Sequence, residues 1–543
     1  MVFLVVTLSI GYQSRYDSSN TFMKDLFKKK IAFVKRHPRL DIVFLLVGLA
    51  IFATITLLNA SRASIWFDEA FSAYIAQFSF ADIATFTASD VHPPFYYWVL
   101  KVWTMFFGTD ELGFRSMSMF FGAGVITAAT LLARRFFGRL VAGVTLLFLI
   151  VSPMLIRYSD EARMYTLAAA IILIATYVLV KATETNKRWQ WIVYGILIAL
   201  GMWTHYFTAL AWIAHWVWRA IVIRKSTTKP KLFWKKFFTK NWIVAHIVAA
   251  ALFLPWIPFM VIQLGGIQAS GFWIGPVGVN SVTNYFTNLF YYLEHDQVEG
   301  WAGVALIVVL VGLGILAYRT YRSFKKETKT QYLLVSALAF VPVLFLFVVS
   351  LPPLHSSFVE RYLLPAIVGF AMFAAVTIVV GTRRWKPVFR VASVLVLVGM
   401  MVYGIVNVYH YGNYNKNSNT HVLTQELVQK IAAEAKPGEP IVANAPWIFY
   451  EAVFYNSADH PIYFIDQDTQ YIYGSLEMLK TRDQHKIIDI DAFTKEHPTI
   501  WYIGVSGGDI ESSRSDWHKV KSISVTSPVD GQTLYRATEF TIN

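Results

Sequence analysis

Long apolar stretches separated by short polar connections run through the first three quarters of the chain. Each stretch has about the 17–25 residues that a helix needs to cross a bilayer. They predict eleven membrane-spanning helices, near residues 40–58, 115–133, 140–156, 164–180, 189–204, 206–223, 242–264, 301–318, 332–351, 362–380 and 388–408. We therefore expect an α-helical polytopic membrane protein with its spanning module over residues 40–410.

One further apolar segment, residues 94–108, is ambiguous because Pro93 and Pro94 precede it and Lys101 interrupts it. The basic connections decide how to interpret it, since Lys and Arg gather on the cytoplasmic side of membrane proteins. The six basic clusters share one face only if this segment does not cross; they are residues 24–39, 134–139, 181–188, 219–240, 319–329 and 383–390. We therefore predict an interfacial helix at 94–108, a cytoplasmic N-terminus and a multi-pass protein of the plasma membrane.

The composition agrees with this class. Hydrophobic residues make up 56% of the chain and charged residues 15%, whereas soluble domains carry about 25% charged residues. An aromatic content of 16% excludes a disordered chain. The absence of Cys excludes a disulfide framework, thiolate metal sites and a cysteine nucleophile.

The net charge of +14 combines two different parts of the chain. Residues 1–410 hold 37 Lys and Arg against 17 Asp and Glu, whereas residues 411–543 hold 11 against 17. The cations of the first part lie in the predicted cytoplasmic connections, so we interpret them as topology signals and expect no nucleic-acid partner. The acidic second part is expected to lie outside the cytoplasm.

Residues 411–543 have the pattern of a small α/β domain, which is compatible with a Rossmann-like arrangement. Helical apolar spacing covers 421–435 and ends at Lys436-Pro437-Gly438. Strands are predicted near 440–443, 461–465 and 499–505, with a helix near 446–456. The domain lacks a glycine-rich phosphate-binding signature, so we expect it to pack or to position an acceptor.

Residues 1–39 precede the first span and are predicted to be cytoplasmic. The apolar segment Met1–Gly11 lacks a basic leader and is too short to span, so no cleaved signal is expected. Met23, followed by Lys24, is an alternative translation start.

The predicted outer connections carry few charged groups, and these recur at one membrane depth. The candidate site residues are Asp68, Glu69, Asp90, His92, Arg115, Arg163, His205, Tyr206, Glu360 and Arg361. Ionisable groups at span ends are costly outside a protein-lined cavity, so the pattern predicts a shared pocket in the module, whose first outer loop is 59–114. The alternative is that single side chains reach the interface separately.

Such a set could transfer a sugar from a lipid carrier. An acceptor hydroxyl needs a carboxylate base close to its proton, and Asp68 beside Glu69 fits that role. The departing lipid phosphate needs cations, and the forked, always-charged guanidinium suits phosphate. Arg115, Arg163 and Arg361 fit this second role.

Several motifs resemble a known family. Asp68-Glu69, followed by Asp90-Val91-His92-Pro93-Pro94, resembles protein O-mannosyltransferases and the wider bacterial family 39 glycosyltransferases, including the aminoarabinose-transferase-like branch. Asp160-Glu161-Ala162-Arg163-Met164-Tyr165 and Glu360-Arg361-Tyr362-Leu363-Leu364-Pro365 are similar to segments of the bacterial branch. The resemblance covers about 40–410 and implies the GT-C fold, with a periplasmic α/β domain behind it.

The resemblance also implies an inverting transferase that uses a polyprenyl-phosphate sugar donor and an acceptor hydroxyl on a protein, lipid or glycan. In such enzymes the Asp of the Asp-Glu pair is the general base, a role implied for Asp68, and Glu69 would orient the acceptor. The family's phosphate-binding arginine corresponds to Arg115. Some lipid A aminoarabinose transferases bind a divalent metal, which Asp90, His92 and His205 could hold here.

Other interpretations remain open at this point. Asp68 and Glu69 could cap the helix that begins there. Arg163 could pair with Asp160 or Glu161, and His205 could be a packing residue. Glycines over 265–300, followed by an aromatic stretch, predict a flap that is mobile or fixed.

A different function class is a transporter or flippase of lipid-linked sugars, and a third possibility is a degenerate transferase that only binds. A transporter predicts internal repeats and polar groups near mid-membrane. The sequence shows no twofold repeat, and its outer charges cluster at one depth. The transferase hypothesis is therefore the leading one.

Overall fold

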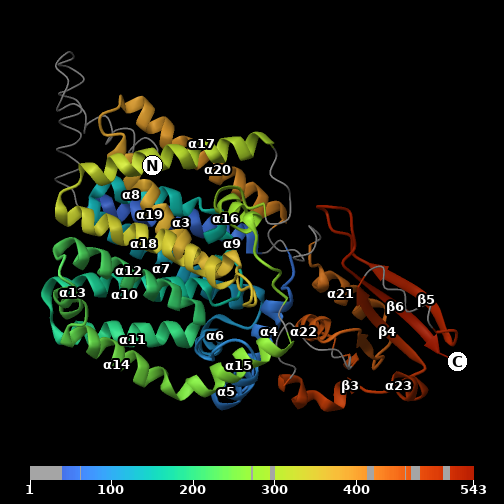
Figure 1. Cartoon of the computed structure of the whole chain (residues 1–543). Coiled ribbons are helices and arrows are strands. Elements are labelled where there is room, and N and C mark those ends of the chain that lie inside the picture. Colours follow the sequence, from blue (N-terminus) through green and yellow to red (C-terminus); the bar gives the residue numbers. More distant parts are fainter. Residues whose placement is uncertain are drawn as a thin grey trace.

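The structure is a computed structural model that describes residues 39–60, 63–270, 273–293, 300–411, 421–458, 460–465, 477–505 and 514–542. The predicted cytoplasmic segment before Arg39, with both candidate start methionines, lies outside these ranges. The chain forms a helical bundle followed by a C-terminal domain with a β-sheet, as predicted (Figure 1).

The bundle is built from long helices joined by short connections. In chain order these are α3 (Arg39–Ala60), α7 (Glu111–Phe137), α8 (Arg139–Ile150), α9 (Pro153–Ser159), α10 (Tyr165–Thr185), α11 (Arg188–Thr204), α12 (Ala209–Ser226), α14 (Lys240–Phe253), α15 (Ile257–Ser270), α17 (Gly300–Ser323), α18 (Lys326–Val349), α19 (Leu364–Gly381) and α20 (Pro387–Tyr411). Shorter helices are α4 (Phe67–Ile75), α5 (Phe80–Ser89), α6 (Phe95–Phe107), α13 (Pro230–Phe237) and α16 (Val279–Tyr291).

Nine helices of the described part are long and apolar enough to cross a membrane. The other two predicted spans have evident reasons for falling short. α8 and α9 qualify only as a pair because they meet at a bend of 58°, and α11 has 17 residues, at the lower limit for a span. The helices therefore agree with the predicted architecture, with one span broken near its end.

The segment predicted to be interfacial forms α6, a helix of 13 residues. At 1.5 Å per residue it is about 20 Å long, which is too short to cross a bilayer. It begins after Pro94 and ends at Gly108, whose φ of 89° suits glycine. With α4 and α5 it lies at the end of the bundle nearest the C-terminal domain (Figure 1).

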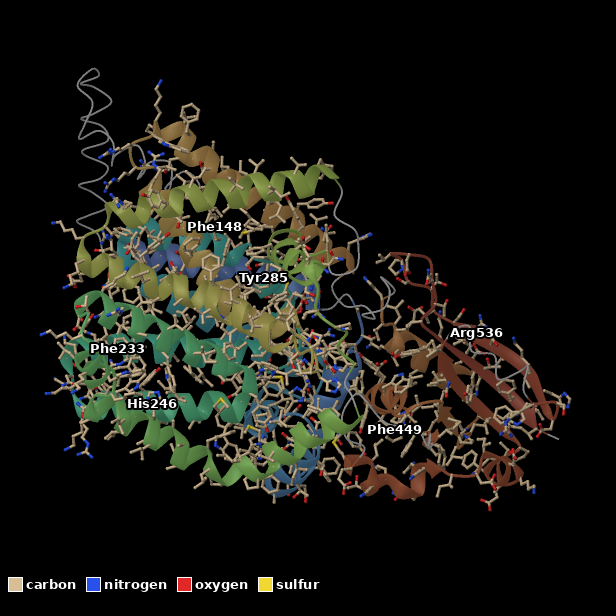
Figure 2. The ribbon with its side chains drawn as sticks, viewed as in Figure 1. Phe148, Phe233, His246, Tyr285, Phe449 and Arg536 are labelled. Carbon is tan, nitrogen blue, oxygen red and sulfur yellow. The ribbon has the colours of Figure 1, made fainter. Side chains whose placement is uncertain are left out.

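Helices α10 and α19 form the centre of the bundle. In their apolar windows 72% and 89% of residues are buried, compared with 17% for α3 and 22% for α17. Helices surrounded by other helices are apolar on all sides, and Phe148 of the neighbouring α8 is fully buried inside the bundle (Figure 2). The outer helices expose apolar side chains such as Leu46 and Ile307, as a lipid-facing surface requires.

The basic connections meet at the end of the bundle away from the C-terminal domain. Arg134, at the end of α7, pairs with Asp41 at the start of α3, with 2.6 Å between Nη2 and Oδ2. Phe137 stacks on Phe324, between α17 and α18, at a centroid distance of 6.0 Å. The connections that the sequence assigned to one face therefore contact one another.

The C-terminal sheet has the strand order β3-β2-β1-β4-β6-β5. Three strands were predicted: β1 (Ile441–Ala443), β2 (Ile462–Ile465) and β4 (Thr499–Val505). They pair in parallel, β3 (Lys486–Ile487) joins β2, and β6 (Tyr535–Ile542) and β5 (Trp517–Ser524) extend the sheet antiparallel. The helices are α21 (Thr424–Glu434), α22 (Pro446–Tyr455) and α23 (Ile490–Glu496). The sequence did not indicate β5 because it is an exposed strand with Lys519 and Lys521 in its middle.

Helix α22 packs against α4 and joins the domain to the bundle. The Tyr450 ring lies 5.1 Å from that of Tyr74 and 5.9 Å from that of Phe71, between ring centroids. Phe449, on the side of the domain that faces the bundle (Figure 2), lies 6.4 Å from Tyr74. The domain therefore contacts the helix that carries Asp68.

Candidate active site

A pocket opens beside α4 at the end of the bundle that carries the C-terminal domain. Counted out to its open mouth, it encloses about 390 Å³. Its lining residues are Phe67, Asp68, Phe71, Asp90, Val91, His92, Arg163, Trp273, Arg361 and Tyr362. Five of the residues selected from the sequence thus share one pocket, and they come from four separate segments.

Asp68 is the carboxylate of the Asp-Glu pair that faces the pocket. It sits in the first turn of α4, where the helix dipole favours an anion. Its Oδ2 accepts a hydrogen bond of 3.1 Å from Nη1 of Arg361, and 17% of its side chain is exposed. The Arg361 guanidinium is 5.0 Å from the ring centroid of Trp273 and 5.8 Å from that of Tyr362, so aromatic rings shield the pair from water.

Arg163 approaches the same carboxylate from a second side. Its Nε lies 3.9 Å from Oδ2 of Asp68. Its Nη1 donates to the Asp68 carbonyl oxygen and to Oγ of Ser72, each at 3.2 Å, and Nη2 lies 3.4 Å from Nε2 of His92. Two buried guanidinium groups therefore flank one carboxylate.

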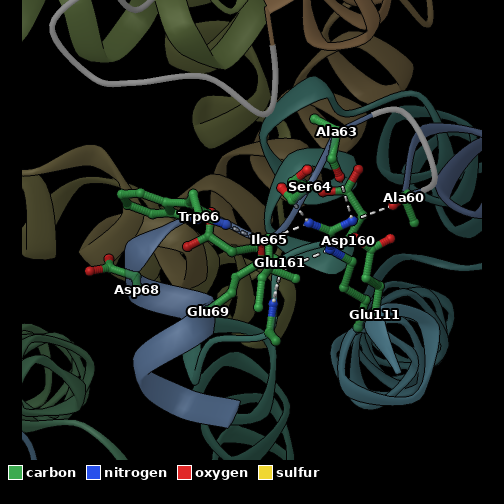
Figure 3. Close-up of polar contacts among 12 residues, drawn as sticks. Ala60, Ala63, Ser64, Ile65, Trp66, Asp68, Glu69, Glu111, Asp160 and Glu161 are labelled. Atoms are coloured by element: carbon green, nitrogen blue, oxygen red, sulfur yellow. Dashed lines mark hydrogen bonds and ion pairs between the residues drawn. The ribbon is translucent and has the colours of Figure 1, made fainter. Parts of the chain in front are cut away.

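Glu69 points away from the pocket into a closed network with Arg115 (Figure 3). Arg115 donates Nε to Oε1 of Glu69 at 2.9 Å and Nη2 to Oε2 at 2.7 Å. Its remaining donors bind the carbonyl oxygens of Ala60, Ala63 and Ser64, so all five guanidinium N–H groups are occupied. Arg115 is fully buried and has no donor left for a ligand.

The capping interpretation of the Asp-Glu pair holds only in part. The backbone N–H of Trp66 donates to Oε2 of Glu69 at 3.4 Å, as at the start of many helices. That carboxylate also accepts from the backbone N–H of Ala162 at 3.0 Å. Glu69 therefore fixes the 160–165 turn against α4, whereas the Asp68 side chain points away from this network (Figure 3).

Asp90 and His92 also line the pocket. Oδ2 of Asp90 lies 3.1 Å from Nδ1 of His92. Burial lowers the pKa of His92, and the hydrogen bond to Asp90 opposes that effect. The ring is therefore neutral at physiological pH, and its Nε2 faces a cation, Arg163.

The pocket does not fit the metal that the resemblance allowed. The His92 and His205 ring centroids are 6.0 Å apart, and the outer nitrogen of His92 faces the Arg163 guanidinium. Within the described ranges, no three His, Asp or Glu side chains are arranged as metal ligands. A dication beside Arg163 would also meet like-charge repulsion.

Besides Glu69 and Arg115, three further candidates lie outside the pocket lining. His205 is buried among aromatic rings, 5.0 Å from Tyr362 and 5.5 Å from Phe207 between centroids, which favours the packing interpretation. Tyr206 donates from its hydroxyl to Gln263 at 2.6 Å and thereby links the start of α12 to α15. Glu360 is half buried and does not line the pocket.

Arg157 takes the partners that the sequence had left open for Arg163. It lies 2.7 Å from Oε2 of Glu161 and 3.7 Å from Oδ1 of Asp160, and Nε donates to the Tyr292 hydroxyl at 3.0 Å. Burial raises the pKa of Asp160 to about 7, although Arg157 opposes that shift. Arg157, on α9, therefore pairs with Asp160 and Glu161. Arg163 pairs with Asp68 instead.

The apolar part of the pocket wall was not predicted from the sequence. It is formed by Phe67, Phe71, Val91, Trp273 and Tyr362. Aromatic residues are abundant throughout this chain, so none stood out. The one available signal was Tyr362 directly beside Arg361, because a cation with adjacent aromatic rings is typical of a ligand pocket. Trp273 belongs to the predicted flap segment and reaches the site.

The C-terminal part of the predicted flap segment, helix α16, is anchored to the bundle. In α16 the residues Tyr285, Leu289 and Phe290 are buried, and Asn407 of α20 donates to the Tyr291 carbonyl oxygen at 2.6 Å. These contacts favour a fixed helix over a mobile one for residues 279–291.

The fold is that of a multi-pass membrane protein with a C-terminal sheet domain, and its pocket holds one carboxylate beside two guanidinium groups. The family described as dolichyl-phosphate-mannose-protein mannosyltransferase matches residues 91–259. This match confirms the predicted resemblance to that family over these residues.

Solved structures give the same fold. The chain is similar to ArnT from Cupriavidus metallidurans bound to undecaprenyl phosphate, with 14% identity, a TM-score of 0.59, and 91% of this chain and 97% of that chain covered. The apo state of that protein gives 13% identity, a TM-score of 0.57, and coverage of 92% and 98%. The Archaeoglobus fulgidus oligosaccharyltransferase is a weaker match, with 11% identity, a TM-score of 0.47, and coverage of 92% and 74%. No curated protein sequence matches the chain significantly.

Proposed function

We propose that this protein transfers a sugar from a polyprenyl-phosphate donor to an acceptor hydroxyl, with inversion at the anomeric carbon. The observation that carries the proposal is the contact of Asp68 with Arg361 and Arg163 inside one pocket. A base and the cations for a leaving phosphate must reach the same sugar, and these three side chains line one pocket. The family match and the similar ArnT bound to undecaprenyl phosphate support the same donor class.

In the proposed reaction Asp68 takes the proton of the acceptor hydroxyl as its oxygen attacks the anomeric carbon. The bond from that carbon to the phosphate oxygen breaks on the opposite face, and its electron pair leaves with the polyprenyl phosphate. Arg361 and Arg163 stabilise the charge that develops on the leaving phosphate. The rings of Phe67, Phe71 and Trp273 exclude water from the reacting centre.

Two sequence-based roles change in this proposal. Arg115 was the expected phosphate ligand, but its five donors are occupied, so we assign the phosphate to Arg361 and Arg163. Glu69, expected to orient the acceptor, is buried against Arg115, so we assign it to holding α4. Asp90 and His92 line the pocket and are proposed to contact the sugar.

We further propose that the pocket opens on the extracytoplasmic side. The basic connections meet at the other end of the bundle, and Lys and Arg mark the cytoplasmic face. This orientation gives a cytoplasmic N-terminus and an extracytoplasmic C-terminal domain. The charges of the pocket lie at one end of the bundle, which favours catalysis over transport, since transporters bind substrate near the midplane.

A direct test uses the purified full chain in lipid nanodiscs with polyprenyl-phosphate sugars, the mannosyl donor first, and envelope extract as the source of acceptor. We expect release of polyprenyl phosphate and incorporation of sugar. Asp68→Asn should lower turnover by at least about 100-fold while the protein stays folded and inserted in the membrane. Normal turnover by the Asn variant would remove Asp68 as the base.

A further inference from the structure

Asp68 occupies the cations that the donor phosphate is proposed to need. Arg361 donates to its Oδ2 at 3.1 Å, and the Nε of Arg163 is 3.9 Å from the same oxygen. The side chains of the two arginines are only 6% and 4% exposed. Opposite charges this close favour the ionised carboxylate, so in this arrangement Asp68 is a poor acceptor of a proton.

The charges of the reactants fit a change of partner. A sugar phosphodiester carries one negative charge, so donor, Asp68 and the two guanidinium ions sum to zero. After transfer the polyprenyl phosphate is a monoester with close to two negative charges, and Asp68 is neutral because it holds the acceptor proton. The sum is again zero, but the negative charge has moved from Asp68 to the leaving phosphate.

We propose that Arg361 and Arg163 are shared counter-ions that pass from Asp68 to the donor phosphate, so that donor binding itself frees Asp68 to act as the base. This inference rests on the proposed function and deepens it. Before the donor binds, the arginines keep Asp68 ionised and inactive. Once the donor phosphate pairs with the arginines, the carboxylate can take the acceptor proton. The pocket thereby couples activation of the base to the presence of the donor.

The surroundings allow this exchange without movement of the guanidinium groups. Arg163 is held in place by the Ser72 hydroxyl and the Asp68 carbonyl oxygen, and Arg361 by the rings of Trp273 and Tyr362. Within the described part of the chain, the buried Nε atoms of both arginines make no hydrogen bond. Each guanidinium is therefore held in place by groups other than the Asp68 carboxylate.

The atoms balance in the step that uses the exchange. The acceptor O–H bond breaks and its proton goes to Asp68, a bond forms from the acceptor oxygen to the anomeric carbon, and the bond from that carbon to the phosphate oxygen breaks. The electron pair of this bond stays on the phosphate, where Arg361 and Arg163 meet it. No oxidant, reductant or further reactant is needed.

Affinity for undecaprenyl phosphate tests the inference, because Asp68 and the lipid phosphate compete for the same cations. Binding to the full chain in nanodiscs is measured for the unmodified protein, Asp68→Asn and Asp90→Asn. Undecaprenol serves as the probe without phosphate. Asp90→Asn is a matched control because it removes a second pocket carboxylate, whose Oδ2 lies 3.1 Å from Nδ1 of His92.

We expect Asp68→Asn to bind undecaprenyl phosphate on the order of tenfold more tightly, since one competing charged hydrogen bond is removed. Asp90→Asn should change the affinity much less, and all three proteins should bind undecaprenol equally. Equal or weaker binding by Asp68→Asn, or equal gains in both variants, would overturn the shared counter-ion. Failure of the unmodified protein to prefer the phosphate over undecaprenol would instead refute the proposed donor class.

Discussion

Asp68 and Arg361 are 293 positions apart in the chain, yet Nη1 of the arginine lies 3.1 Å from Oδ2 of the aspartate. Glu69, the next residue, makes its ion pair with a different arginine, Arg115, at 2.7 Å. The helix turns by about 100° per residue, so consecutive carboxylates on α4 face different surroundings. Asp68 faces the pocket and Glu69 faces the interior. Substituting Asp68 should therefore mainly lower turnover, whereas substituting Glu69 should mainly lower stability.

Glu69→Gln is expected to lower stability more than Asp68→Asn, because Glu69 is 2% exposed whereas Asp68 is 17% exposed and lines the pocket. The amide would leave Arg115 as a fully buried cation without a counter-charge, and breaking a buried pair costs about 3–5 kcal/mol. Thermal unfolding of the detergent-solubilised protein measures the difference. The double variant Glu69→Gln with Arg115→Met should recover part of the loss, because it removes the stranded charge. A folded, stable and inactive Glu69→Gln protein would instead return Glu69 to the catalytic group.

Arg361→Lys is expected to impair use of the donor although it keeps the charge. Lysine lacks the planar fork that contacts a carboxylate and a phosphate together, so KM for the donor should rise and kcat should fall, each by about tenfold. Steady-state kinetics at several donor concentrations measure both constants. Arg135→Lys is the control because Arg135 pairs with Glu184 at 2.6 Å near the basic end of the bundle. Equal effects of the two substitutions would show that Arg361 has no special role.

The stability of the C-terminal domain is expected to fall as the pH rises, because of Glu451. Burial raises the pKa of this carboxyl to about 8, although the Thr424 hydroxyl, which donates to it at 2.6 Å, opposes the shift. In an unfolded chain Glu ionises near pH 4.3. Between these values the folded state holds a proton that the unfolded state releases, so the free energy of unfolding decreases by up to about 1.4 kcal/mol per pH unit.

Glu451→Gln removes the carboxyl group that binds this proton, so the folded and unfolded states no longer differ by it. We expect the variant and the unmodified chain to melt alike near pH 4.5 and the variant to be more stable at pH 8. Melting temperatures of the full chain across this range make the comparison. A pH dependence that survives the substitution would assign it to another group.

Two single cysteines test the proposed orientation in the Cys-free chain. Lys325→Cys lies in an exposed connection at the basic end, and Lys436→Cys in the C-terminal domain, where that side chain is 79% exposed. In intact cells a membrane-impermeant maleimide should label only the second, and detergent should make both reactive. Labelling of position 325 from outside would invert the proposed topology.

The architecture was largely predictable because a bilayer imposes simple rules on a sequence. Apolar stretches of spanning length gave the helices of the bundle, and the basic clusters led to the interpretation of α6 as too short to cross. The exceptions follow from local chemistry, as where Ser152 and Pro153 begin a new helix and the span around Ile150 breaks. The strands hardest to predict were those on an exposed edge, as with Lys519 and Lys521 in β5.

The sequence was enough to predict which charged residues line the pocket, but not which role each of them has. Residue types and their membrane depth were enough to select Asp68, Asp90, His92, Arg163 and Arg361, all of which line the pocket. The partners of each group depend on the direction of every side chain. A sequence with two adjacent acids does not reveal which one a given arginine will meet.

By itself, the sequence determined the class of fold, the basic face and the set of charged groups at the opposite end, because hydropathy and charge act through local composition. Only the tertiary structure decided that Arg115 is enclosed by Glu69 and backbone carbonyls while Arg361 and Arg163 face Asp68. Burying a charged arginine is costly unless it is paired and hydrogen-bonded, and for Arg115 the partners come from segments far apart in the chain.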